Sequence, residues 1–394
     1  MNERSTTPNR RRAGTGTTGT ALAALAALAV LVAACGDDDA TDAAATTTTA
    51  SGSATTDGDA ATTTTGDGGD EGPAETTGAT LVLNWTPNAH HLGVYAAQHE
   101  GWYADAGIDL EILEPTAAGV AQAIGTGDAE FGISVAESVI PARAEGVPIV
   151  SIATILPVND SVMMSLPEDG ITAPADLAGK EYGGYGGSLE TELVNRLVSC
   201  DGGDPDEVAM TEVGNVDYLS GLEADRFDFV WVFEGWDGLR AEVVEGRDVD
   251  YVRFSDHLDC IPNWYTPLFI TSEDLIENDP ALVQAFMDAT AQGYELAMED
   301  PAAAADAMLD LVPEMDEQLI RAAAEYHAPL FAADGSPFGA QERDVWASFD
   351  EFLVEAGLTE QPSEIDDAFT NDFVLVDGGD VDEDEDADGD TADE

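Results

Sequence analysis

The stretch Leu81–Tyr95, which reads LVLNWTPNAHHLGVY, decides how the rest of the chain is interpreted. The apolar run Thr80–Leu83 has the pattern of a buried strand. Pro87 stands where a turn leads into a helix, and helical spacing continues as far as Gly101. In open α/β folds, ligands bind where such strands end and helices begin. We therefore predict ligand contacts from Asn84, Trp85, Asn88, His91 and Tyr95.

The N-terminal segment is typical of an export signal. Arg10–Arg12 form a basic start, and Ala21–Ala34 form an apolar run that ends in small residues. A membrane-spanning helix needs roughly 20 apolar residues, more than this run supplies. Cys35 directly follows the small residues and resembles the lipidated cysteine of a bacterial lipobox. We interpret residues 1–34 as a lipoprotein signal peptide and expect lipidation at Cys35 on the outer face of the cytoplasmic membrane.

Two low-complexity segments flank the part that we expect to fold. Residues 35–78 consist mainly of Thr, Ala, Gly and Asp, and residues 376–394 are mostly acidic, so both are predicted to be disordered. The remaining residues, about 300 in number, suffice for two lobes with their own cores. We predict that residues 79–172 and 265–375 form the first lobe and that residues 173–264 form the second.

The charge excludes one large class of partner. The sequence has 13 Lys and Arg against 80 Asp and Glu, a net charge of −67, whereas a nucleic-acid-binding protein needs a basic surface. We interpret the acidity as a means of staying in solution. Cys200 and Cys260 remain in the folded part, where they either form a disulfide or stay as two buried thiols. We expect no bound metal and no cofactor, and a monomeric chain.

Strands and helices alternate along the folded part, which predicts an α/β protein with mostly parallel sheets. The expected strands of the first series are 108–113, 131–134, 149–156 and 162–166, and those of the second are 181–184, 207–213, 227–233 and 249–254. Four alanine-rich helices are expected to pack back on the first lobe, at 280–297, 301–311, 317–326 and 341–356.

Three more strand-to-helix junctions carry polar or aromatic side chains. Glu137 follows Phe131–Ser134 and either forms a capping box with Ser134 or contacts a ligand. The four glycines of 182–192 allow a backbone to approach a ligand, or else form a plain turn with Ser188 as the N-cap. After the strand 227–233, a carboxylate and an indole stand close together in the sequence. Candidate ligand contacts from these last two junctions are Gly184, Tyr185, Ser188, Glu190, Glu234 and Trp236.

Trp264 and Tyr265 lie at the expected return to the first lobe, where they either contact the ligand or pack the hinge. Taken together, the candidate residues supply aromatic rings, amides, a histidine and carboxylates. No Arg or Lys is among them. Aromatic rings stack on flat ligands, and buried amides and carboxylates recognise ring nitrogens and amino groups. An anion such as a sulfonate or nitrate would need basic residues or at least several helix-end donors. The sequence therefore predicts a flat, neutral or cationic ligand.

Several of these motifs together resemble those of a known family. The motifs Asn84–Asn88, Gly101–Tyr103, Phe131–Ser134, Phe233–Trp236 and Tyr265–Pro267 are similar to those of solute-binding lipoproteins of bacterial ABC importers for thiamine pyrimidine precursors. The resemblance extends over residues 79–358. It implies a type II periplasmic binding protein, in which two α/β lobes joined by two crossings close on a small molecule and present it to a permease. Related proteins in the superfamily bind alkanesulfonates, taurine, nitrate or riboflavin-type solutes, and these ligands are the alternatives.

An enzyme also resembles this chain. The fungal pyrimidine synthase of thiamine synthesis uses pyridoxal phosphate, a reactive lysine and histidine, and a cysteine-rich motif. In this sequence Ile133 and Glu137 stand at the lysine and histidine positions, and no cysteine cluster is present. We therefore expect a binding protein and not an enzyme.

Overall fold

The computed structural model describes residues 76–333 and 335–374. The expected signal peptide 1–34, the lipidation site Cys35, nearly all of the tether 35–78 and the acidic tail 376–394 lie outside these residues. Among the described residues, no helix is both long enough and apolar enough to cross a membrane.

The first lobe is built on a five-stranded sheet with the order β2-β1-β3-β10-β4. Strands β1 to β3 are parallel to one another, whereas β10 pairs antiparallel with β3 and β4. The strands are β1 (Thr77–Val82), β2 (Ile108–Leu113), β3 (Phe131–Ser134), β4 (Ile149–Thr154) and β10 (Leu268–Ser272). Residues 149–154 are buried along their whole length because β4 is covered on both faces.

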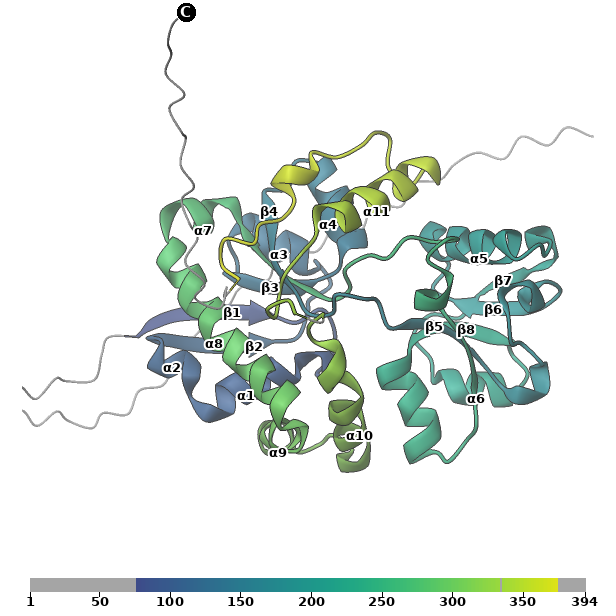
Figure 1. The fold of residues 1–394 in the computed structure, drawn as a ribbon, viewed down its shortest axis with the longest axis horizontal. Helices are drawn as coiled ribbons and strands as arrows, with labels where there is room; N and C mark the ends of the chain where they lie inside the picture. The colour runs from purple at the N-terminus through teal and green to yellow at the C-terminus, as the bar shows by residue number, and fades with distance from the viewer. Residues whose placement is uncertain (1–75, 334, 375–394) are drawn as a thin grey trace, which may run out of the picture. The chain divides into compact units, whose positions relative to one another are not determined.

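Helices cover this sheet on both faces (Figure 1). They are α1 (Leu92–Glu100), α2 (Trp102–Asp105), α3 (Val120–Thr126), α4 (Ala136–Ala144), α7 (Glu273–Asn278), α8 (Pro280–Glu299), α9 (Pro301–Leu311), α10 (Glu317–His327) and α11 (Arg343–Glu355). Two glycines allow α1 and α8 to pack closely, because a Cβ on Gly293 would lie 1.9 Å from the carbonyl oxygen of Gly93. The expected return of the alanine-rich helices to the first lobe is confirmed, since α8 and α9 pack against α1.

The second lobe contains a sheet with the order β7-β6-β8-β5-β9. Strand β6 is parallel to β7 and β8, whereas β5 is antiparallel to β8 and β9. The strands are β5 (Ser161–Ser165), β6 (Glu181–Gly184), β7 (Ala209–Glu212), β8 (Phe229–Phe233) and β9 (Asp250–Arg253), and the helices are α5 (Ser188–Cys200) and α6 (Tyr218–Glu223). The α/β fold class and the two lobes are confirmed, with the qualification that both sheets are mixed.

The structure corrects one expected lobe boundary. The strand expected at 162–166 was assigned to the first lobe, but β5 lies in the second sheet, so the chain crosses at residues 155–160 and not near 172. Only six residues separate β4 from β5, and they contain no helix. Six residues are too few for a parallel crossover within one sheet. The pairing of β5 with β8 and β9 shows that this link leads into the second sheet.

Hydrogen bonds join the two crossing segments, residues 155–160 and 254–267. The backbone N–H of Asn159 donates to Oδ1 of Asn263 at 3.0 Å, and Nδ2 of Asn263 donates to the carbonyl oxygen of Pro157 at 2.8 Å. The N–H of Ile155 donates to the carbonyl oxygen of Pro267 at 2.9 Å. The two crossings therefore form one connected hinge.

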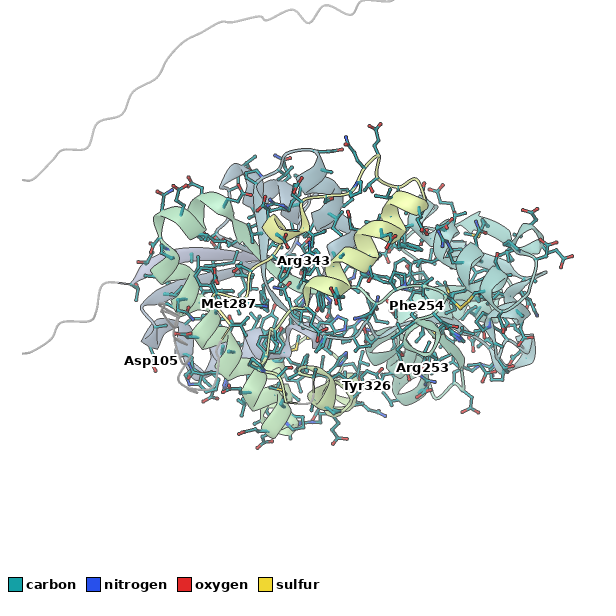
Figure 2. All side chains as sticks on the ribbon, turned by 45° about the horizontal axis from the view of Figure 1, so that its top comes forward. Asp105, Arg253, Phe254, Met287, Tyr326 and Arg343 are labelled. Carbon is teal, nitrogen blue, oxygen red and sulfur yellow. A yellow bond between two sulfur atoms is a disulfide. The ribbon has the colours of Figure 1, made fainter. Side chains whose placement is uncertain are left out.

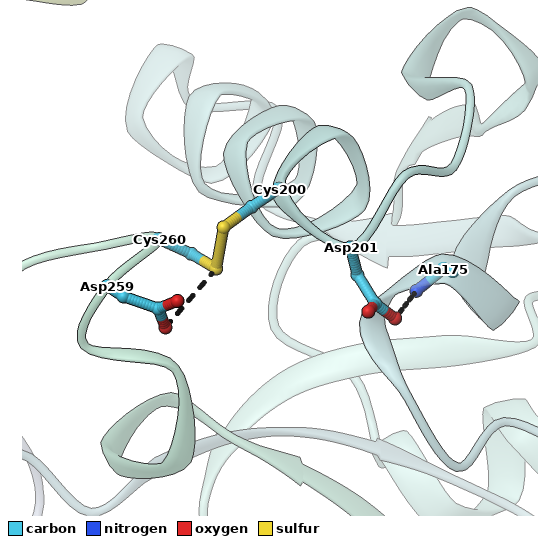
Figure 3. Close-up of a disulfide and its surroundings, with 5 residues drawn as sticks. All are labelled: Ala175, Cys200, Asp201, Asp259 and Cys260. Atoms are coloured by element: carbon cyan, nitrogen blue, oxygen red, sulfur yellow. Dashed lines mark hydrogen bonds between the residues drawn. A yellow bond between two sulfur atoms is a disulfide. The ribbon is translucent and has the colours of Figure 1, made fainter.

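A disulfide joins Cys200 to Cys260, which settles the alternative that the sequence left open (Figure 3). Cys200 ends α5 and Cys260 lies in the return crossing, with 60 residues between them in sequence and 5.6 Å between their Cα atoms. The bond therefore attaches the return crossing to the second lobe.

Removal of this disulfide is expected to destabilise the chain. Closing a loop of 60 residues reduces the entropy of the unfolded chain, which corresponds to about 4 kcal/mol. A Cys200→Ser/Cys260→Ser double variant should lose unfolding free energy of this order in urea denaturation. A reducing agent should lower the wild-type midpoint and leave that of the double variant unchanged. Equal midpoints for the two oxidised proteins would contradict the expectation.

Candidate functional site

The opening stretch places an indole and two amides at the end of β1. Asn88 caps the helical turn Ala89–His91 by accepting a hydrogen bond from the N–H of His90 at 3.0 Å. Asn84, Trp85 and Asn88 all line a cleft of about 380 Å³. Trp85 is 45% exposed, so its ring is free to stack on a ligand.

His91 and Tyr95 are not part of this cleft wall, contrary to our prediction. His91 is fully buried, its Nδ1 accepts the N–H of Asn88, and its Nε2 lies 2.9 Å from Oδ1 of Asn84. Burial is the main cause that lowers the pKa of His91 to about 3, and the neighbouring His90 adds to the effect, so the ring is neutral. His91 thus positions Asn84 and Asn88. Tyr95 packs in the hydrophobic core of the first lobe.

Glu137 lies on the cleft at the start of α4. The expected capping box with Ser134 does not form, because the helix begins at Ala136 and Val135 occupies the N-cap position. Burial raises the pKa of Glu137 to about 7, although its own backbone N–H and the nearby Trp264 indole favour the charged form. Among the described residues, neither Oε2 of Glu137 nor Nε1 of Trp264 completes a hydrogen bond of good geometry.

The glycine-rich loop is held by Glu190. One carboxylate oxygen accepts the hydroxyl of Tyr182 and the N–H of Tyr185, both at 3.0 Å, and the other accepts the N–H of Gly187 at 2.9 Å. From the sequence we expected these backbone N–H groups to approach a ligand. In the structure they donate to Glu190. A Cβ on Gly184 would lie 2.4 Å from the Tyr182 ring, so a side chain there would disrupt the packing.

Within this loop, the cleft receives two of the predicted residues. Glu190 and Tyr185 line it, and Tyr185 is 50% exposed. Gly184 is buried behind them, and Ser188 is exposed elsewhere as the first residue of α5, because Gly187 and not Ser188 is the N-cap.

The wide helical turn after β8 presents Trp236 and Asp237 to the cleft. Burial raises the pKa of Asp237 to about 6, while Arg240 opposes this effect. The Arg240 guanidinium lies 5.7 Å from the centre of the Trp236 ring. Glu234, which we predicted to bind ligand, instead forms a two-point ion pair with Arg253 at 2.5 and 2.7 Å.

Trp264 and Tyr265 pack the hinge, which was the alternative interpretation of the sequence. Trp264 is 1% exposed, and its ring stacks on Phe349 with 5.0 Å between centres. The Tyr265 hydroxyl accepts the N–H of Glu342 at 2.7 Å. Neither residue lines the cleft.

Elements of both lobes therefore meet at one cleft. Residues on its wall that sequence reasoning missed are His90, Val135, Asn215, Val216, Tyr218, Trp231, Val232, Phe233, Asp237 and Thr266. Asn215 and Tyr218 follow β7, so the rule applied to the other strand ends would have found them. None of the described residues that line the cleft is Arg or Lys. The site can stack a flat ring and pair with it through amides and carboxyl groups that burial keeps partly neutral.

Comparisons with known proteins agree with this geometry. A family model described as NMT1/THI5 like matches residues 88–304, more than half of the chain. The formylaminopyrimidine-binding protein of Halalkalibacterium halodurans is 28% identical over 299 residues, which cover 74% of this chain and 89% of that protein. The 4-amino-5-hydroxymethyl-2-methylpyrimidine phosphate synthase of Legionella pneumophila is 26% identical over 298 residues, 75% of this chain and 92% of that protein.

A solved structure of similar fold is the alkanesulfonate-binding protein SsuA of Xanthomonas axonopodis bound to MOPS, with a TM-score of 0.58 and 13% identity. The match covers 75% of this chain and 99% of that one. At this identity the likeness establishes the periplasmic binding protein fold alone.

Truncation of Glu190 is expected to loosen the glycine-rich loop. Glu190→Ala leaves the N–H groups of Tyr185 and Gly187 and the Tyr182 hydroxyl without their acceptor, which should cost roughly 1 to 3 kcal/mol of unfolding free energy. Glu192→Ala is the matched control, because Glu192 forms a half-buried i,i+4 pair with Arg196 on the same helix and should change stability by less than about 0.5 kcal/mol. Equal effects of the two substitutions in urea denaturation would refute this role.

Proposed function

Because the chain belongs to the NMT1/THI5-like family, we propose that it captures a thiamine pyrimidine precursor, a hydroxymethyl- or formylaminomethyl-aminopyrimidine, for an ABC importer. In this proposal the protein is exported, attached to the membrane through a lipid on Cys35, and active as a monomer. The two lobes close on the ligand, and the closed form is presented to the permease.

The observation that carries the proposal is the unpaired carboxyl oxygen of Glu137 in a cleft lined by aromatic rings. An aminopyrimidine presents a ring nitrogen that accepts a hydrogen bond beside an amino group that donates one. A neutral carboxyl group presents the complementary pair, a hydroxyl donor and a carbonyl acceptor. With a pKa of about 7, Glu137 is available in this form near neutral pH.

The aromatic residues of the cleft fit a flat ligand. Trp85 belongs to the first lobe, whereas Tyr185 and Trp236 belong to the second, so lobe closure places a planar ring between them. An alkanesulfonate or nitrate would instead be bound by basic residues or by several helix-end N–H donors. Among the described lining residues none is Arg or Lys, which favours the pyrimidine over these anions.

We propose a binding protein and not a synthase. The resemblance to the fungal enzyme assigns its reactive lysine and histidine to the positions of Ile133 and Glu137. Ile133 is fully buried in β3 and has no amine with which to hold pyridoxal phosphate. Some relatives are named as synthases. Detection of enzymatic turnover by this chain would therefore oppose the proposal.

Isothermal titration calorimetry tests the ligand. We expect aminopyrimidine precursors to bind with a dissociation constant near micromolar, about −8 kcal/mol. Trp85→Ala should weaken binding by roughly 1 to 3 kcal/mol, whereas Trp85→Phe, which keeps a flat ring, should lose less. Taurine, nitrate, an alkanesulfonate and riboflavin should not displace the pyrimidine. Binding of one of these solutes in its place, or wild-type affinity in Trp85→Ala, would overturn the proposal.

The pH dependence of binding tests the role of Glu137. The complex contains one proton shared between the carboxyl group and the pyrimidine ring, and the free protein loses this proton above the Glu137 pKa of about 7. Affinity should therefore fall with rising pH and approach a tenfold loss per pH unit between pH 7 and 9. Glu137→Gln keeps a donor and an acceptor without a titrating proton, so its affinity should be flat in this range. A flat wild-type profile would contradict the proposed contact.

A further inference from the structure

Three residues that are distant in sequence form a buried cluster beside the cleft. They are His90 at the start of α1, Asp160 at the end of the first crossing, and His327 at the end of α10. His90 and His327 are 4% and 0% exposed, and Asp160 is 9% exposed. One ligand atom of each lies within 4.8 Å of those of the other two.

The separations within the cluster are unusual for hydrogen bonds. Nε2 of His90 lies 3.5 Å from Oδ2 of Asp160, and Nε2 of His327 lies 3.4 Å from the same oxygen. A hydrogen bond between a ring N–H and a carboxylate is typically about 2.7 to 2.9 Å long. Ligand atoms about 2.0 to 2.1 Å from a tetrahedral ion lie roughly 3.3 Å apart. The two nitrogen–oxygen distances match edges of such a coordination tetrahedron.

The orientation of His327 points to the same conclusion. Its Nδ1 donates to the carbonyl oxygen of Ala323 at 2.8 Å, so the neutral ring carries its lone pair on Nε2. This lone pair faces the Asp160 carboxylate, and neither Nε2 of His327 nor Oδ1 of Asp160 has a hydrogen-bond partner among the described residues. Two acceptors face each other favourably only when a proton or a metal ion lies between them. Gly235 packs against the ring, because a Cβ there would lie 2.3 Å from Cε1 of His327.

We propose that His90, Asp160 and His327 bind a divalent transition-metal ion such as zinc. Two imidazoles and one carboxylate form a set of donors that suits such ions better than it suits magnesium or calcium. Three protein ligands leave one position of the ion open. We expected no metal from the sequence, in which these residues lie 70 and 167 positions apart.

The site joins the lobes at the hinge. His90 and His327 belong to the first lobe, whereas the carbonyl oxygen of Asp160 accepts the N–H of Glu234 in the second. His90 lines the ligand cleft, and Asp160 lines a second cavity of about 380 Å³ together with Arg253 and Tyr326, which are labelled in Figure 2. The ion thus has a route of entry, and its binding should stabilise one arrangement of the hinge.

Zinc titration of the full-length chain after treatment with a chelator tests the site. We expect one tightly bound zinc ion per chain by calorimetry, and a higher thermal midpoint with zinc than without. The titration is run with excess magnesium and 0.5 M salt, because the many exposed carboxylates bind hard cations weakly. A Cys35→Ser background removes the thiol outside the Cys200–Cys260 bond.

The variants His327→Gln and His90→Gln should lose the tight site and the zinc-dependent rise in midpoint. His99→Gln is the matched control, because His99 also contacts two carboxylates, at 3.1 and 3.4 Å, but on the surface. It should keep wild-type zinc binding. Tight zinc binding that persists in both cluster variants, or that is absent from the wild type, would overturn the proposal.

Cobalt substitution gives a test that does not depend on the folding of any variant. Co²⁺ in the wild-type cluster should show the intense visible absorption of a four- or five-coordinate ion, and zinc should remove it. A weak spectrum typical of octahedral cobalt would show binding by surface carboxylates alone and would refute the site.

Discussion

The side-chain amide of Asn263 holds together the two segments on which the arrangement of this protein depends. Asn263 lies in the second crossing. Its Oδ1 accepts the N–H of Asn159 and its Nδ2 donates to the carbonyl oxygen of Pro157, and both of these residues lie in the first crossing. The lobes are joined through these segments and through the helices around them, and the hydrogen bonds of Asn263 hold the two segments together. Trp264, which follows Asn263, is buried and stacks on Phe349.

The position of the cleft was predictable because strand ends have a local signature. An apolar strand followed by amides and rings identified Asn84, Trp85 and Asn88, and the same rule identified Tyr185 and Trp236. What the sequence does not encode locally is the direction of each side chain. Glu234 and Asp237 lie three residues apart in one wide turn, yet Asp237 lines the cleft and Glu234 pairs with Arg253. Choosing between them requires the path of the backbone.

Two other errors have the same origin in long-range contacts. The placement of β5 depended on pairing with β8, a strand more than 60 residues away, and the short connection before β5 was the only local indication. His91 had the right position for a ligand contact, but burial directs both of its ring nitrogens to Asn84 and Asn88. His90, one residue earlier, lines the cleft, and its neighbours Asp160 and His327 come from distant segments. No pattern in a single stretch reveals such a cluster.

The charge of the chain and the chemistry of the cleft favour the same class of ligand for different reasons. A net charge of −67 opposes the approach of any anion through its long-range field, except at high ionic strength where this field is screened. Inside the cleft, burial raises the pKa of Glu137 and Asp237 to about 7 and about 6, so a fraction of each carboxyl group is neutral near neutral pH. A neutral aminopyrimidine meets neither barrier. Because screening by salt removes only the long-range effect, the proposed preference for a neutral ligand in a saline environment rests on the cleft itself, where no Arg or Lys is among the described lining residues.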